Sequence, residues 1–189
     1  MKRLTLVVAL LATFACREKP AAQNAPTQTP ATPGAAGPAG ASPAAAAALP
    51  TSDPAPSFDL PLVGGGNVTL ASLAGKTVLI DFWATWCPPC LEEVPELNAI
   101  SRELQGKNAS ILAISVDTLS LEALTEWLAE RDVTYRVALG DTDLAGMYGA
   151  DAFPFHVVVG PDGKVLERLA AGFHDREQLR AVLARHTKP

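Results

Sequence analysis

The chain lacks a second pair of closely spaced cysteines. One CxxC motif contains Cys87 and Cys90, and the remaining thiol is Cys16. The three histidines do not have the spacing of a zinc finger. These two absences argue against a zinc site. We therefore expect neither a metal nor another cofactor.

Basic residues are also in the minority. From Thr51 onward there are 11 lysines and arginines against 19 aspartates and glutamates, which gives a formal charge of −8. Binding to nucleic acid or to an anionic membrane surface needs basic patches. The composition therefore argues against both kinds of partner.

The N-terminal apolar run, Leu4 to Phe14, is shorter than the ~20 residues that cross a bilayer. It follows the basic pair Lys2-Arg3, so we expect residues 1–16 to be a signal peptide for export. Cys16 comes directly after a small residue and before a charged run, which resembles a bacterial lipoprotein signal and implies lipidation of this thiol. Ordinary cleavage before an idle cysteine is the alternative.

The next segment, residues 17–56, consists mainly of Ala, Pro, Gly, Ser and Thr and holds nine of the sixteen prolines. Such a composition cannot form a core, so we expect a disordered linker. Extended proline-rich chain of this length would reach on the order of 100 Å. The remaining residues, 57–189, then form one domain.

Strand-like runs alternate with helical periodicity in this domain. The expected strands are 57–60, 67–70, 77–83, 110–116, 135–138, 155–159 and 165–169. Helices are expected at 88–105, around Leu121 to Leu128, at 144–147 and around Leu179 to Leu183, with Tyr148 and Met147 in the core. This order predicts an α/β three-layer sandwich: a central mixed sheet with helices on both faces, extended by an N-terminal β-hairpin.

The CxxC motif lies where the apolar strand 77–83 gives way to a helical pattern. Unpaired N–H groups and the positive end of the dipole at a helix N-terminus favour a thiolate. We therefore expect Cys87 to be an exposed nucleophile and Cys90 to be a shielded resolving thiol. A permanent structural bond is the alternative, although a bond across two residues removes little entropy from the unfolded chain.

Several features of residues 56–187 together resemble the thioredoxin superfamily, in particular its exported TlpA/ResA-like branch. These are the segment Asp81–Cys90, a helix-kinking Pro95, an added helix and strand between Val116 and Asp141, Pro154 at the start of a strand, and the turn Pro161-Asp162-Gly163-Lys164. The resemblance implies a thioredoxin-like fold and thiol-disulfide exchange.

Two acids are assigned by this resemblance. Asp81 interrupts an apolar strand and matches the buried acid that assists the resolving cysteine in thioredoxin. Glu93 matches an acid that is prominent in ResA-like proteins, so both are expected to move protons. Glu93 also fits a solvated helix face, because Glu92 and Glu96 are its neighbours.

Substrate contacts are expected around Pro154, which resembles the cis-proline that faces the active disulfide in this fold. The backbone of Phe153 would pair with an extended substrate segment, and Trp86 and Pro88 would border it. An ordinary edge-strand proline is the alternative. The chain departs from its relatives in the next two positions, where Phe155-His156 replaces small hydroxyl residues.

The leading hypothesis is a monomeric, membrane-anchored reductase of protein disulfides on the periplasmic side of a bacterial cell envelope. By resemblance, it would serve cytochrome c or copper-site maturation and receive electrons from a membrane donor. A general oxidase or isomerase stays open, as does a copper(I) carrier that uses Cys87, Cys90 and His156. A peroxiredoxin is disfavoured, because Ala84 stands where that family needs a hydroxyl.

Overall fold

The structure is a computed structural model that describes residues 53–187. The expected signal peptide, the thiol of Cys16 and the linker up to residue 52 lie outside the described residues. No helix within the described part has the length and apolar character needed to cross a membrane.

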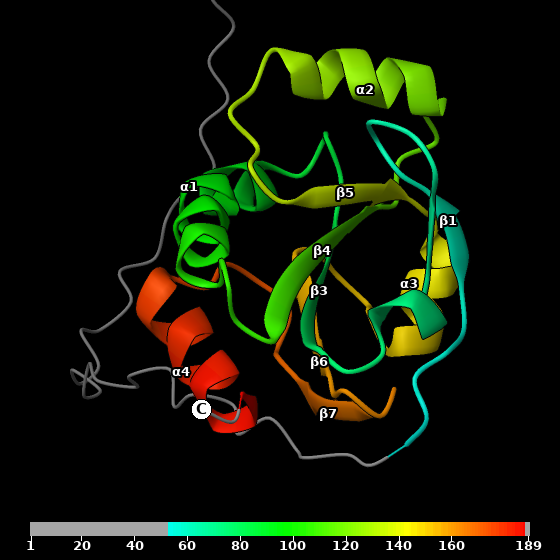
Figure 1. Cartoon of the computed structure of the whole chain (residues 1–189). Coiled ribbons are helices and arrows are strands. Elements are labelled where there is room, and N and C mark those ends of the chain that lie inside the picture. Colours follow the sequence, from blue (N-terminus) through cyan, green and yellow to red (C-terminus); the bar gives the residue numbers. More distant parts are fainter. Residues whose placement is uncertain (1–52, 188–189) are drawn as a thin grey trace, which may run out of the picture. The chain divides into compact units, whose positions relative to one another are not determined.

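Five strands form one mixed sheet in the order β5-β4-β3-β6-β7 (Figure 1). They are β3 (Thr77–Trp83), β4 (Ala109–Ser115), β5 (Arg136–Leu139), β6 (Phe155–Val159) and β7 (Val165–Arg168). The pairs β3/β4 and β4/β5 are parallel, whereas β3/β6 and β6/β7 are antiparallel. The predicted mixed sheet is therefore confirmed.

Four α-helices and a separate hairpin complete the fold (Figure 1). They are α1 (Pro88–Glu103), α2 (Leu121–Ala129), α3 (Thr142–Tyr148), α4 (Arg176–His186), and the strands β1 (Asp59–Pro61) and β2 (Asn67–Thr69), followed by the short 3-10 helix η1 (Ala71–Leu73). The hairpin strands pair antiparallel, as predicted.

The apolar core has one layer on each face of the sheet. Because side chains alternate along a strand, Leu79 of β3 packs with Leu97 of α1 and Leu179 of α4, whereas Ile80 and Phe82 pack in the opposite layer. By the same alternation Asp81 lies on the face that α1 and α4 cover. The fold thus places a carboxyl group in an otherwise apolar layer.

The folded domain begins before the expected boundary at residue 57. Asp53 O accepts from the N–H of Val165, Ala55 N–H donates to Gly163 O, and Pro54 forms a bridge with Lys164 at the start of the edge strand β7. At the opposite edge, Leu62 forms a bridge with Ala138 of β5. Backbone hydrogen bonds fix residues 53–56 to the domain even though their composition is that of a linker.

Candidate functional site

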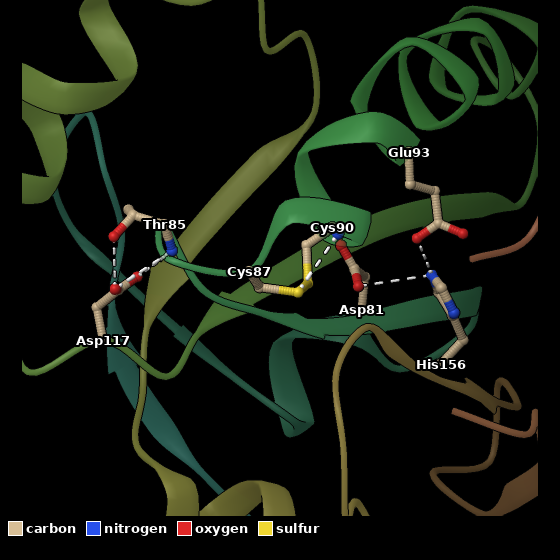
Figure 2. The surroundings of a disulfide bond; sticks show 7 residues. All are labelled: Asp81, Thr85, Cys87, Cys90, Glu93, Asp117 and His156. Carbon is tan, nitrogen blue, oxygen red and sulfur yellow. Dashed lines mark hydrogen bonds and ion pairs between the residues drawn. A yellow bond between two sulfur atoms is a disulfide. The ribbon is translucent and has the colours of Figure 1, made fainter. Parts of the chain in front are cut away.

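The two cysteines of the CxxC motif form a disulfide at the N-terminus of α1 (Figure 2). Cys87 is the N-cap, Pro88 and Pro89 occupy the first two helical positions, and the Cα atoms of the cysteines are 5.3 Å apart. The N–H of Cys90 donates to the Cys87 sulfur at 3.3 Å. Proline suits these positions because the first N–H groups of a helix have no intrahelical partner.

The expectation that Cys87 is exposed is wrong for this oxidised form. Cys87 is 4% exposed and Cys90 3% exposed. Both belong to the apolar cluster that contains Phe82, Ala84 and Phe155. The N-terminus of α1 is therefore packed into the core. An attacking thiolate therefore has only a narrow approach to the disulfide.

Behind the disulfide, two carboxyl groups meet one imidazole (Figure 2). The β3/β6 register places Asp81 directly opposite His156, and Glu93 projects from α1 one turn after Cys90. His156 Nε2 lies 3.5 Å from Asp81 Oδ1 and 3.1 Å from Glu93 Oε2. The three side chains are almost completely buried.

Glu93 does not lie on a solvated helix face. Its side chain occupies the buried stripe of α1, which runs through Cys90, Glu93, Leu97, Ile100 and Leu104 at helical spacing. The apolar residues at positions 90, 97, 100 and 104 mark this stripe in the sequence, and position 93 falls on it. That periodicity was the available signal for a buried acid.

Burial dominates the acid-base properties of this cluster. It raises the pKa of Asp81 to about 7, with His156 acting to lower it and Glu93 to raise it further. Burial also raises the pKa of Glu93 to about 8. The pKa of His156 is lowered, again mainly by burial. Near neutral pH both acids therefore carry protons to a substantial extent, while the imidazole is neutral.

The structure adds His174, which the sequence did not single out. Its backbone N–H donates to Glu93 Oε1 at 2.7 Å, and its ring meets that of His156 edge to face with centroids 5.2 Å apart. Donor atoms of Glu93, His156 and His174 lie within 4.8 Å of one another, close enough to hold one metal ion. In the described chain His156 is thus grouped with Glu93 and His174 and not with the two sulfurs of the copper(I) alternative.

The turn before β6 has the conformation that the resemblance implied: the Phe153–Pro154 peptide is cis. The N–H of Gly172 donates to Pro154 O at 2.9 Å. Within residues 53–187 no hydrogen bond uses the backbone of Phe153, which leaves it open to a partner. The Trp86 side chain, 64% exposed, meets the Phe153 ring edge-on with centroids 6.2 Å apart, and Pro88 is also exposed.

The side chains of Phe155 and His156 point into the protein. Phe155 is 5% exposed and His156 is fully buried. The departure from small hydroxyl residues at these two positions therefore changes the interior behind the disulfide, and it does not change the exposed surface.

Polar contacts also hold the loop between β3 and α1, which contains Thr85 (Figure 2). Asp117, just after β4, accepts from the N–H of Thr85 at 3.0 Å and from its hydroxyl at 2.7 Å. Ser115 Oγ donates to the same carboxylate at 2.6 Å. No local pattern in the sequence indicates this contact, because Thr85 and Asp117 are 32 residues apart.

This fold and site define a thioredoxin-like thiol-disulfide oxidoreductase. The family model for the AhpC/TSA family matches residues 51–168, and the chain belongs to that family. It is 31% identical to the thiol-disulfide oxidoreductase ResA of Bacillus cereus over 134 residues, 70% of this chain and 76% of the relative.

Solved structures show the same likeness. A DsbE-type thiol:disulfide interchange protein from Chlorobium tepidum has a TM-score of 0.63 at 29% identity and covers 72% of this chain and 97% of its own. The exposed lipoprotein thioredoxin Etrx1 of Streptococcus pneumoniae has a TM-score of 0.62 at 25% identity, with 69% and 99% covered. The Cys87–Cys90 pair is accordingly the redox-active dithiol of this oxidoreductase.

Asp117→Ala should lower the free energy of unfolding by about 2–3 kcal/mol, because it removes hydrogen bonds to a buried charged acceptor and leaves their donors unpaired. Urea unfolding of the oxidised protein measures this. Asp151→Ala, at an exposed aspartate, is the control. Equal midpoints for the two variants would contradict the anchoring role.

Asp81→Asn should stabilise the protein more at pH 8 than at pH 5. The unfolded chain ionises Asp81 near its ordinary value, whereas the folded chain resists ionisation up to about 7. Between these two pKa values the folded state binds more protons than the unfolded state, so wild-type stability falls as the pH rises through this range. Urea unfolding at both pH values measures the difference, and a gain that does not depend on pH would count against a buried protonated acid.

Proposed function

We propose that this protein reduces disulfide bonds of other proteins outside the cytoplasm, on the periplasmic side of a bacterial cell envelope. The observation that carries the proposal is the Cys87–Cys90 disulfide at a helix N-terminus with Asp81 and Glu93 buried behind it. A disulfide with only a structural role would have no need of two buried acids at its inner side.

The proposed reaction begins with the reduced enzyme. The Cys87 thiolate attacks a substrate disulfide and forms a mixed disulfide, and one substrate sulfur leaves as a thiolate that takes a proton from water. Cys90 then passes its proton to Asp81, with Glu93 as the second proton carrier, and attacks the Cys87 sulfur. The second substrate sulfur leaves, so two electrons pass from the dithiol to the substrate.

Substrate binding is proposed at the surface beside the disulfide. The free backbone N–H and C=O of Phe153 would pair with an extended segment of the substrate, next to Pro154. The exposed Trp86 and Pro88 would border that segment with apolar surface. The narrow approach to Cys87 favours a flexible segment over a rigid one.

The direction of electron flow follows from the few hydrogen bonds to the Cys87 sulfur. A strong oxidant needs a stabilised thiolate, yet Pro88 and Pro89 have no N–H to donate. In the described chain the donor to this sulfur is the N–H of Cys90. Weak stabilisation of the thiolate supports a reductant.

Export, anchoring and partners extend this proposal. Residues 1–16 would direct export, Cys16 would carry the lipid, and the linker would hold the domain away from the membrane. A relative with a similar fold is an exposed lipoprotein, which supports the anchor. The monomeric enzyme would be a reductant in an oxidising compartment, so it would need a membrane electron donor. Its substrates would be proteins that await haem or copper, such as apocytochrome c.

Trapping tests the proposed roles. Cys90→Ala should accumulate mixed disulfides through Cys87, because the resolving thiol is gone, whereas Cys87→Ala should form none. The wild-type protein should reduce insulin, and both variants should lose this activity. Mass spectrometry of the trapped species in the cell envelope identifies the substrates, and trapping through Cys90 in preference to Cys87 would reverse the assigned roles.

The redox potential tests the direction. Equilibration with glutathione should give a value nearer to ~−270 mV than to ~−120 mV. Pro89→Ala restores one N–H near the sulfur and should raise the potential by about 20 mV, whereas Pro95→Ala, farther along the same helix, should leave it unchanged. A wild-type value at the oxidising end would make the protein an oxidase.

A further inference from the structure

Four titratable side chains form a continuous group that leads from the inner side of the disulfide to the surface. Asp81, Glu93 and His156 have side chains that are at most 3% exposed. His174 is 16% exposed and is the member of this group that reaches solvent. Any proton that leaves the two buried acids by way of this group must leave through His174.

The atoms that face one another in this group lack hydrogen-bond partners. They are Asp81 Oδ1, His156 Nε2, Glu93 Oε2 and His174 Nδ1. Their separations are 3.5 Å from Asp81 to His156 and 3.1 Å from His156 to Glu93, and His174 Nδ1 lies 3.9 Å from the other oxygen of Glu93. Unpaired buried polar atoms are costly, so a row of them calls for an explanation.

We propose that His156 and His174 are positioning residues that carry protons between the buried acids and solvent, in the order Asp81, His156, Glu93, His174. This inference rests on the proposed function, because it gives Asp81 a route for the proton that the reaction delivers to it. The reaction itself supplies the proton, and no electron moves along the path.

The path answers a need of the resolving step. A share of Asp81 carries a proton near neutral pH, and that proton must leave before Asp81 can accept the one from Cys90. It would pass from Oδ1 to His156 Nε2, then to Glu93 Oε2. A carboxyl group can take a proton at one oxygen and release one from the other, so Glu93 Oε1 would deliver to His174 Nδ1 once a rotation of the His174 side chain brings these atoms from 3.9 Å to hydrogen-bond distance. His174 then passes a proton to water, so His156, Glu93 and His174 return to their starting states, and Asp81 is left ionised and ready to accept the proton of Cys90.

Other ionisable groups around the path do not replace it. Tyr135 faces both acids, but burial raises its pKa so far that it keeps its proton. Glu96, on the same helix as Glu93, raises the pKa of Glu93 further. Asp175 acts on His174 in the opposite direction to burial and favours its protonated form. None of these three lies between the acids and His174 in the row of unpaired atoms.

A metal ion is the competing occupant of the same atoms. Zn²⁺ accepts imidazole and carboxylate ligands, and three of the four residues bring donor atoms within 4.8 Å. Protons are favoured because the row of facing atoms also includes Asp81, which is not one of the three metal donors and which faces His156. The experiment below therefore also measures Zn²⁺ binding.

The test follows the reaction of the reduced protein with the disulfide reagent DTNB in a stopped-flow instrument. Release of the first thionitrobenzoate reports attack by Cys87, and release of the second reports attack by Cys90. His174→Ala removes the ring but keeps the backbone N–H that donates to Glu93. It should slow the second release about tenfold at pH 6 and leave the first unchanged.

The pH profile and rescue distinguish proton transfer from structural damage. The defect should vanish above pH 8, where Asp81 has lost its proton in advance, and added imidazole should restore the second release at pH 6 in His174→Ala. His156→Gln should show the same pH-dependent defect without rescue, because its site is buried. His186→Ala, a histidine paired with Glu167 away from this group, is the control and should behave as wild type.

Each remaining result overturns one specific claim. Absence of the first release in the wild-type protein would refute the proposed function itself. An unchanged second release in both histidine variants would overturn the proton path, as would a slow second release at every pH that imidazole does not restore. One equivalent of Zn²⁺ bound by the oxidised protein in equilibrium dialysis, and lost in His174→Ala, would assign the group to a metal.

Discussion

Two carboxyl groups are held out of water in the apolar layer of this fold, and the chemistry of the site depends on that constraint. Asp81 and Glu93 lie in the layer that joins the sheet to α1 and α4, where Leu79 and Leu97 supply the apolar contacts. The packing that attaches the helix is also what raises the pKa values of the acids. Stability and proton chemistry therefore share the same contacts, and a change that loosened α1 would also return the acids to ordinary ionisation.

The disulfide lies between two polar anchors that come from distant parts of the chain. In front, Asp117 holds Thr85 and with it the loop that leads into the CxxC motif. Behind, Glu93 holds the backbone of His174. The first anchor fixes where the helix begins, and the second fixes its buried side, so the position of the sulfurs is set by contacts on both sides of the motif.

Local patterns in the sequence predicted most elements closely, since periodicity and turn residues act over short distances. The strand 155–159 agrees with β6, and the cis form of Pro154 followed from the family resemblance. The surroundings of individual side chains were harder to predict from the sequence. Met147 was assigned to the core but is 63% exposed. The contacts of Asp117 and His174 join segments that only the tertiary fold brings together, and no local pattern could reveal them.

The chain that precedes β3 has a consequence for how the domain behaves among copies of itself. Open strand edges invite pairing between chains and so lead to aggregation. Pro54 forms a bridge at the start of β7 and Leu62 forms a bridge with Ala138 of β5, so chain that precedes β3 occupies part of each edge of the sheet. Domains brought close together would be protected in part from edge-to-edge association at these positions.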